Sequence, residues 1–249
     1  YAEALKTAEN ALTFKQVVKS IAHQHDLYAT FMPKPIFGVC GSGMHCHQSF
    51  FDMKTRKNIF FDEKDEYKLS KVAKHFIAGQ LEHVRAMSAI LSLTVNSYKR
   101  LVPGYEAPVY VCWGQRNRSA LIRIPRFSQG REQATRAELR CPDPSNNPYL
   151  ALAVMLEAGL DGIKRGIMPP DPVEENVYEF NKDELAYRNI ATLPGSLSEA
   201  IEELKKDKVM EQALGSHTYQ IYIHSKMAEW DEYSIQVTEK KKKKYFETT

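Results

Sequence analysis

The segment Asn96-Ser-Tyr-Lys-Arg-Leu-Val-Pro-Gly-Tyr-Glu-Ala-Pro108 separates a long helical pattern from a series of short strand patterns. Pro103-Gly104 is typical of a turn, and Pro108 keeps the chain that follows it out of a helix. The segment is therefore predicted to be a loop with Arg100 at its base and Glu106 beyond its tip. A glutamate carried by a closing loop can take a proton or neutralise a cation. The alternative is an ordinary surface loop.

Helical periodicity recurs on both sides of this loop. Apolar residues at three- and four-residue steps, a proline at a first turn and one capping-box pattern all contribute. The predicted helices span residues 2–25, 69–93, 147–165, a short stretch from Ser196, and 216–245.

Short strand patterns lie mainly in the first half of the chain. They occur at residues 28–32, 44–51, 109–112, 121–124 and 134–141. Because strands collect in the first half and helices in the second, the sequence predicts an α+β domain.

The composition indicates one large folded domain without a broad basic surface. The chain has 249 residues, 43% of them hydrophobic, which is enough to bury a core. Without the five lysines at 240–244, interpreted as a solvated helix face or tail, the formal charge of +3 becomes −2. This balance argues against a nucleic-acid partner. No apolar stretch approaches the roughly 18 residues of a membrane span.

The four cysteines, at positions 40, 46, 112 and 141, contain no Cys-x-x-Cys pair. Their spacing matches neither a zinc knuckle nor a redox motif, and free thiols favour a reducing, cytoplasmic location. The N-terminus has neither a signal-type apolar stretch nor an initiator Met. We therefore expect the chain to begin partway through a longer protein.

The stretch Gly41-Ser-Gly-Met-His45-Cys-His47-Gln-Ser49 joins a glycine-rich turn to a strand pattern. Residues two apart share one face of a strand, so His45, His47 and Ser49 are expected to point the same way. Two imidazoles and a hydroxyl can hold a metal and a phosphate oxygen, and the glycines allow backbone to approach a ligand closely. Histidines at the surface or the edge of the core are the alternative.

Two further segments are rich in arginine. In Arg136-Ala-Glu138-Leu-Arg140 the charged residues share one strand face, which suits a metal ligand flanked by phosphate or carboxylate clamps. Exposed ion pairs of little energetic value are the alternative. Arg118 and Arg123 suit planar, bidentate phosphate recognition. The chain has no Walker-type loop or dinucleotide-binding glycine fingerprint, so an ATP site here requires a different cradle.

Together these segments resemble glutamine synthetases of the bacterial and archaeal type I. Order and spacing agree along nearly the whole chain, at residues 29–35, 41–45, 96–108, 117–125, 136–140, 142–150 and 158–164. The resemblance implies a curved, largely antiparallel sheet, part of a catalytic barrel, flanked by helices. It also implies that residues 1–249 are a C-terminal catalytic domain, with a β-grasp domain and the first metal-ligand strands absent. Such a fragment would be inactive alone.

The activity implied by the resemblance is ATP-dependent ligation of ammonia to L-glutamate. ATP would phosphorylate the side-chain carboxylate, and ammonia would displace phosphate from γ-glutamyl phosphate to give glutamine, with Mg²⁺ or Mn²⁺ as the metal. The family pattern further implies a homo-oligomer, a dodecamer of two hexameric rings. A γ-glutamylpolyamine synthetase and a catalytically inactive structural or regulatory relative remain alternatives. The match of residues 99–108 to the ammonia-using pattern favours glutamine synthesis.

The resemblance also assigns roles to individual residues. The metal ligands are His45 and Glu138. The ATP-binding residues are His47, Ser49, Arg118, Arg123 and Arg136. The substrate-binding residues are Gly41, Arg100, Glu106, Arg118 and Arg140. Glu106 would close the site and help to deprotonate ammonium, and Arg118 with Arg123 would stabilise the transferring phosphoryl group.

Two positions depart from the family pattern, which usually has Asn at Cys40 and often has Lys at Gln133. Cysteine is a poor hydrogen-bonding substitute for asparagine, which puts substrate contact at Cys40 in question. Tyr178 matches a region that is adenylylated in some type I enzymes.

Overall fold

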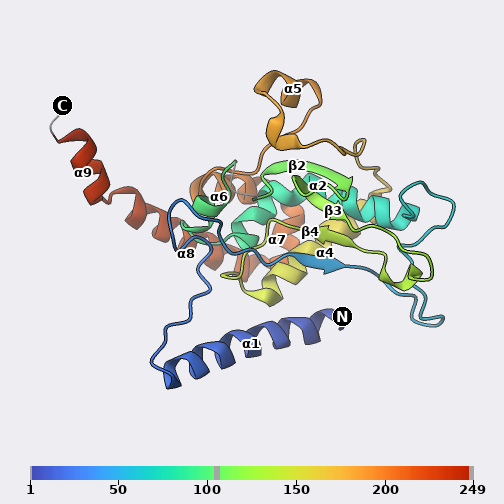
Figure 1. The fold of residues 1–249 in the computed structure, drawn as a ribbon, viewed down its shortest axis with the longest axis horizontal. Coiled ribbons are helices and arrows are strands. Elements are labelled where there is room, and N and C mark those ends of the chain that lie inside the picture. The colour runs from blue at the N-terminus through green and yellow to red at the C-terminus, as the bar shows by residue number, and fades with distance from the viewer. Residues whose placement is uncertain (1, 104–106, 247–249) are drawn as a thin grey trace.

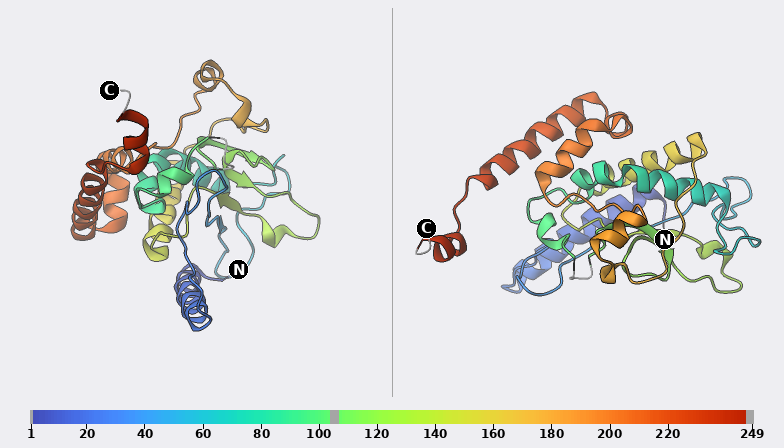
Figure 2. Two further views of the ribbon diagram at one scale, coloured as in Figure 1. Left: turned by 60° about the vertical axis from the view of Figure 1, so that its left-hand side comes forward. Right: turned by 90° about the horizontal axis from the view of Figure 1, so that it is seen from above.

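The computed structural model describes residues 2–103 and 107–246, so the predicted flap residue Glu106 lies outside the described residues. A small sheet lies at the centre, with helices packed on it, α1 along one side and α8–α9 extending away from the body (Figures 1 and 2). The strands are β1 Cys46–Gln48, β2 Tyr110–Gln115, β3 Ala120–Ile124 and β4 Ala137–Leu139. The helices are α1 Ala4–Gln24, α2 Lys71–Leu91, α3 Ser97–Arg100, α4 Pro148–Arg165, α5 Lys182–Tyr187, α6 Leu197–Lys206, α7 Lys208–Leu214, α8 Ser216–Ser234 and α9 Glu239–Tyr245.

The four strands form one mixed sheet in the order β1-β4-β3-β2. The β1–β4 and β3–β4 pairs are antiparallel, as expected, whereas β2 and β3 are parallel. The chain turns at Arg116, which has a φ of 64°, and residues 116–119 lead back to the start of β3. The α+β class is confirmed, with a parallel pair that the sequence pattern did not indicate.

The core is built around the contact between α2 and α4. Ser70 caps the start of α2 and Asn147 caps α4, which ends at Gly166 in the left-handed conformation with a φ of 64°. Gly79 and Gly162 allow the two backbones to touch, because a Cβ on Gly79 would lie 2.1 Å from the Ala158 carbonyl oxygen. Helix α6 packs on the same α2 through buried Ile201 and other apolar residues.

Three local predictions were wrong in detail. Residues 28–32 form no strand, and the chain beside them is held by a side chain: Asn96 Oδ1 accepts from the Lys34 amide and Asn96 Nδ2 donates to the Lys34 carbonyl. The predicted C-terminal helix breaks after Ser234, and Thr238 caps the separate helix α9. The short helices α3, α5 and α7 were not predicted. Over the described part of the chain, no helix is both long and apolar enough to cross a membrane.

Candidate active site

The sheet brings three predicted site residues into one row. Glu138 in β4 lies opposite His47 in β1 and opposite Arg123 in β3. Directly paired residues of antiparallel strands project from the same face, so this register gathers an imidazole, a carboxylate and a guanidinium. The predicted sharing of one face by Arg136, Glu138 and Arg140 follows from the same alternation.

Glu138 is the buried centre of this face, with 3% of its surface exposed. Its Oε1 lies 3.0 Å from His45 Nδ1, its Oε2 accepts a hydrogen bond from Arg123 at 2.7 Å, and Arg140 Nε is 3.6 Å from Oε1. Burial opposes ionisation, but the hydrogen bond with His45 and the charge of Arg123 lower the pKa of Glu138 to about 2. The carboxylate is therefore an anion at neutral pH, held in a cationic frame.

A cavity of about 730 Å³ opens beside Glu138's neighbours on β1. His45, His47 and Ser49 all line it, but so do Met44 and Cys46, so the lining does not test the predicted common face. Its other walls come from α1, α4 and the segment 130–136. The sequence did not predict that α1 and α4 line this cavity through small residues such as Ala8 and Ala151. The alanines at helical spacing in these segments were the available signal.

The segment 130–136 forms the polar wall of this cavity. Arg136 Nε donates to His47 Nδ1 at 3.0 Å, and its Nη1 donates to the Ala134 carbonyl at 2.8 Å. Gln133, at the position where the family often has Lys, accepts from the Asn58 amide at 3.0 Å and also lines the cavity. Partial burial, opposed by the charge of Glu138, lowers the pKa of His47, which favours the neutral ring that accepts from Arg136.

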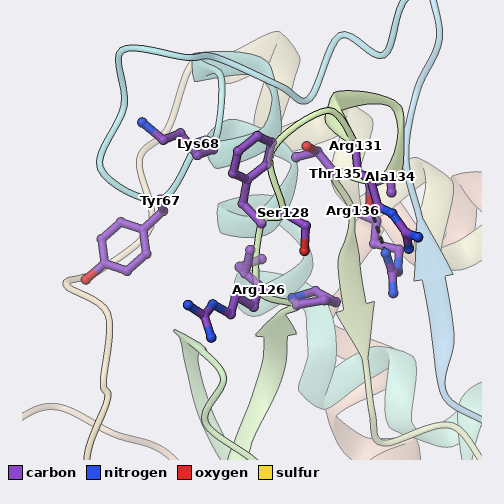
Figure 3. Close-up of a pocket in the computed structure, with 11 residues that line it drawn as sticks. Tyr67, Lys68, Arg126, Ser128, Arg131, Ala134, Thr135 and Arg136 are labelled. Carbon is purple, nitrogen blue, oxygen red and sulfur yellow. Dashed lines mark hydrogen bonds between the residues drawn. The ribbon is translucent and has the colours of Figure 1, made fainter.

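A second, smaller cavity of about 150 Å³ lies on the other side of the same segment (Figure 3). The two cavities share Arg131, Ala134 and Arg136. In Figure 3 the side chains of Arg131 and Arg136 extend toward strand β1, away from Tyr67 and Lys68. Both arginines therefore stand between the two cavities and line each of them.

Arg140 connects the charged face to the loop that carries Arg118. Its Nη1 donates to the carbonyls of Arg118 and, at 3.3 Å, Ala120. Burial lowers the pKa of Arg140, with Glu138 opposing that shift. Arg118 itself is exposed, while Asn117 and Ser119 on either side of it are buried. Neither neighbour was singled out from the sequence, although two small polar residues flanking an arginine before an apolar strand were a usable signal.

Arg100 is placed differently from the other predicted clamps. It is 4% exposed and donates to the carbonyls of Cys141 at 2.6 Å, Pro142 at 3.3 Å and Arg140 at 3.1 Å. Its side chain packs under Gly41 and Gly43, where an added Cβ on Gly43 would lie 2.6 Å from Arg100 Nη2. Arg100 thus fixes the glycine turn against the end of β4, and its contact with substrate stays a prediction.

Cys40 and Tyr178, two further positions named from the family pattern, differ in burial. Cys40 is exposed in the turn before Gly41. Tyr178 is half-buried, its hydroxyl donates to the Ala107 carbonyl at 2.9 Å, and its ring lies 6.0 Å from that of Tyr110. Adenylylation of Tyr178 stays a prediction.

The metal-ligand prediction agrees with the chemistry of His45 and Glu138. An ionised carboxylate and an imidazole within 3.0 Å of each other are donors suited to Mg²⁺ or Mn²⁺. Residues 2–103 and 107–246 contain no group of three or more His, Cys, Asp or Glu arranged to hold a metal. The role of His45 and Glu138 as metal ligands stays a prediction.

Comparison with known proteins gives the family. Residues 1–245 match the family described as "Glutamine synthetase, catalytic domain". The chain belongs to the glutamine synthetase family. Glutamine synthetase of Clostridium saccharobutylicum is 54% identical over 95% of the chain, and that of Thermus thermophilus is 53% identical over 100% of it.

The glutamine synthetases that the chain matches are about twice as long. The chain spans 52% of the Clostridium protein and 54% of the Thermus protein. Among solved structures, a GmaS/ADP complex superposes with a TM-score of 0.89 at 36% identity, covering 99% of the chain and 56% of that protein. GmaS without ligand superposes with a TM-score of 0.86 at 35% identity, covering 98% of the chain and 54% of that protein.

Proposed function

We propose that the complete gene product is a glutamate–ammonia ligase and that this chain forms one wall of its active site. The observation that carries the proposal is Glu138, an ionised carboxylate held by His45, Arg123 and Arg140 beside a cavity of about 730 Å³. A phosphoryl-transfer site needs cationic groups around transferring oxygens, and this face supplies them on rigid strands. Family membership supports the same activity.

The nucleotide is proposed to bind in the larger cavity. His47, Ser49 and Arg136 line it, and Arg136 is already oriented by His47 and by the Ala134 carbonyl. A guanidinium held in place binds phosphate oxygens with less loss of side-chain entropy. GmaS, which superposes on almost the whole chain, was solved as a complex with ADP, and this supports nucleotide binding by the family member proposed here.

L-glutamate and the transferring phosphoryl group are proposed to lie between the nucleotide and the loop that carries Arg118. Arg118 and Arg123 would stabilise negative charge on the phosphoryl oxygens, and Arg140, with the turn at Gly41 and Arg100, would define the glutamate side of the site. Glu106 would accept a proton from ammonium and exclude water from γ-glutamyl phosphate, which hydrolyses if exposed.

His45 and Glu138 are the residues that would hold Mg²⁺ or Mn²⁺. When bound, the divalent ion would neutralise charge on the nucleotide phosphates. Glu138 is kept ionised by its neighbours and needs no proton release to act as a ligand. Further carboxylate ligands, the β-grasp domain and a cytoplasmic dodecameric assembly belong to the same proposal for the complete protein.

The test uses the purified complete gene product with ATP, L-glutamate, Mg²⁺ and ammonium, and measures glutamine and phosphate. We expect both products in equal amounts, and turnover at least about 10-fold lower when putrescine replaces ammonium, since amine specificity is a difference in transition-state binding. Turnover with putrescine alone would replace this proposal by a γ-glutamylpolyamine ligase. Absence of turnover with either amine would identify an inactive relative.

A matched pair of variants tests the site itself. His45→Ala is expected to raise the Mg²⁺ concentration needed for half-maximal activity by about 10-fold or more, as loss of a ligand does. His75→Ala is the control, because His75 bonds the Ile167 carbonyl and lines neither cavity. An unchanged Mg²⁺ requirement in His45→Ala would remove His45 from the ligand set.

A further inference from the structure

The loop that carries Arg118 is held in place by the two residues next to Arg118, Asn117 and Ser119, and not by the Arg118 side chain. Arg118 is exposed, whereas Asn117 is 8% exposed and Ser119 is 3% exposed. Two buried polar side chains therefore flank the exposed side chain of Arg118. Buried polar groups are retained in folded proteins when they are hydrogen-bonded, and both of these are.

Asn117 uses the whole hydrogen-bonding capacity of its amide. Nδ2 donates to the Val173 carbonyl at 2.7 Å and to the Glu175 carbonyl at 2.8 Å. Oδ1 accepts from the Ser119 amide at 2.8 Å and from the Ser119 hydroxyl at 2.6 Å. Two donors and two acceptor positions are all that an asparagine side chain offers. The side chain is thus locked in a single orientation, between its own loop and a segment 56 to 58 residues away.

The distant segment, residues 173–177, runs against the loop along its length. The Val173 amide donates to the Trp113 carbonyl at 2.8 Å, and the Val177 amide donates to the Ser119 hydroxyl at 2.9 Å. The approach at Gly114 is so close that an added Cβ would lie 2.3 Å from the Val173 carbonyl oxygen. The segment therefore supports the loop from one side.

Arg140 supports the loop from the other side, because its guanidinium donates to the Arg118 carbonyl. Arg140 also lies 3.6 Å from Glu138, whereas Asn117 bonds its own loop and residues 173–175. The backbone of Arg118 is fixed between them, and its side chain direction follows from that backbone.

We propose that Asn117 is a positioning residue that acts through Arg118, by fixing the loop backbone against residues 173–177. This inference rests on the proposed function, in which Arg118 stabilises the transferring phosphoryl group. In that proposed function, Asn117 touches neither substrate nor nucleotide. Its loss would leave Arg118 present and charged but imprecisely aimed, and a displacement of about 1 Å in a catalytic group lowers rates by up to about 100-fold.

A double-mutant cycle in the complete gene product tests the inference. Asn117→Ala, Arg118→Ala and the double variant are compared with wild type for kcat of glutamine formation and KM for ATP. We expect Asn117→Ala to lower kcat by about 10- to 100-fold with KM for ATP changed less than about 3-fold. We also expect the double variant to be no slower than Arg118→Ala, because the contribution of Asn117 passes through that arginine.

Asn181→Ala is the matched control, since Asn181 also bonds a backbone amide, that of Glu184 at the start of α5. Its kcat should stay within about 2-fold of wild type, as expected of a surface cap. If Asn117→Ala does not fold, Ser119→Ala replaces it in the cycle, because it removes the Ser119 hydroxyl that joins Asn117 to the Val177 amide.

The outcomes separate the two proposals. Losses that multiply in the double variant, or an Asn117→Ala kcat within 2-fold of wild type, would overturn the positioning role alone. Absence of glutamine formation by the wild-type protein would overturn the proposed function and this inference with it.

Discussion

The contact between α2 and α4 and the charged face of β3 and β4 solve opposite packing problems. At the helix contact, glycines remove side chains so that backbones touch: a Cβ on Gly162 would lie 2.2 Å from the His75 carbonyl oxygen. On the strands, long charged side chains are brought together around one buried carboxylate, Glu138. The first region gains dispersion and hydrophobic burial, and the second spends folding free energy on desolvated charge.

The difference indicates where stability and activity are separable. Substitutions at the helix contact change packing and leave the charged face in place. Substitutions of exposed groups at the site change charge without opening the core. His83 and α1 are the informative exceptions, since His83 is a titratable side chain within the helical layer and α1 is a helix whose large apolar side chains are mostly exposed.

The largest effect is expected for Arg118→Ala in the complete gene product. Loss of a group that stabilises transition-state charge lowers kcat by about 100-fold or more. The Arg118 side chain is exposed and makes no hydrogen bond within the described residues, so the free energy of unfolding should change by less than about 0.5 kcal/mol. Steady-state kinetics and urea unfolding check both.

Arg126→Ala is the control for that prediction, because Arg126 is exposed near the smaller cavity. Its kcat should remain within about 3-fold of wild type, as for a surface residue outside the site. A kcat for Arg118→Ala close to that of Arg126→Ala would contradict the role of Arg118.

Gly79→Ala should damage stability without a specific effect on KM. The new methyl group meets the Ala158 carbonyl at 2.1 Å and the Gly162 backbone at 2.8 Å, and backbone cannot move aside as a side chain can. Overpacking of up to about 3 kcal/mol exceeds the gain of about 1 kcal/mol in helix propensity. Urea unfolding should therefore show a net loss of about 2 kcal/mol.

Gly195→Ala is the matched glycine control, since its added Cβ would meet only Glu199 carboxylate oxygens at 3.6 Å or more. A Gly79→Ala variant as stable as this control would mean that α2 and α4 do not approach so closely.

His83→Gln should change the pH dependence of stability. His83 Nδ1 lies 2.6 Å from Asp207 Oδ2 and Nε2 lies 3.0 Å from Asp161 Oδ2, and Arg165 also donates to Asp161. Burial opposes protonation of the ring, but these two carboxylates outweigh it and raise the pKa of His83. The stabilisation is thus fully present below the unfolded pKa, about 6.5, and is lost as pH rises through the raised folded pKa.

We expect wild type to exceed His83→Gln in free energy of unfolding by about 2 kcal/mol at pH 6, with a smaller difference at pH 9. Urea unfolding at the two pH values measures it. His75→Gln is the control in the same helix, because its partner is the Ile167 carbonyl and carries no charge. A pH-independent difference would show that His83 is neutral in the folded protein.

The smallest effect is expected for Leu5→Gln in α1, measured on residues 1–249. Leu5 is 65% exposed, and Ala8 is the one buried residue of α1. Folding buries little of the apolar surface of Leu5, so the substitution should change the free energy of unfolding by less than about 0.5 kcal/mol. A loss above 1 kcal/mol would mean that this face of α1 is covered.

Local periodicity predicted the existence of the long helices well, and the ends of α1, α2 and α4 to within a few residues, but it missed the break after Ser234 in the helix expected over 216–245. It could not show that α1 and α2, both 21 residues long, differ in burial, because both carry apolar residues at helical spacing. It also failed at residues 28–32, which have a strand-like composition but form no strand. The backbone beside them, at Lys34, is bonded instead to the Asn96 side chain.

The candidate site was also predicted only in part, because local sequence patterns do not show burial or distant partners. Strand alternation predicted two groups, one of His45, His47 and Ser49 and one of Arg136, Glu138 and Arg140. It could not show that the two groups meet, with Glu138 opposite His47 and Arg136 bonded to His47. Arg100 has the same residue type as Arg118, yet one is buried against three carbonyls and the other is exposed. Residue type and spacing carry no measure of burial.

The sequence by itself determined the family, the α+β class and the residue types of the site, because these depend on order, spacing and local periodicity. Tertiary structure alone decided that Glu138 contacts both His45 and Arg123, and that Asn117 bonds the Val173 and Glu175 carbonyls. The physical reason is that strand register and long-range hydrogen bonds depend on which distant backbone groups become neighbours, and no local pattern specifies that choice.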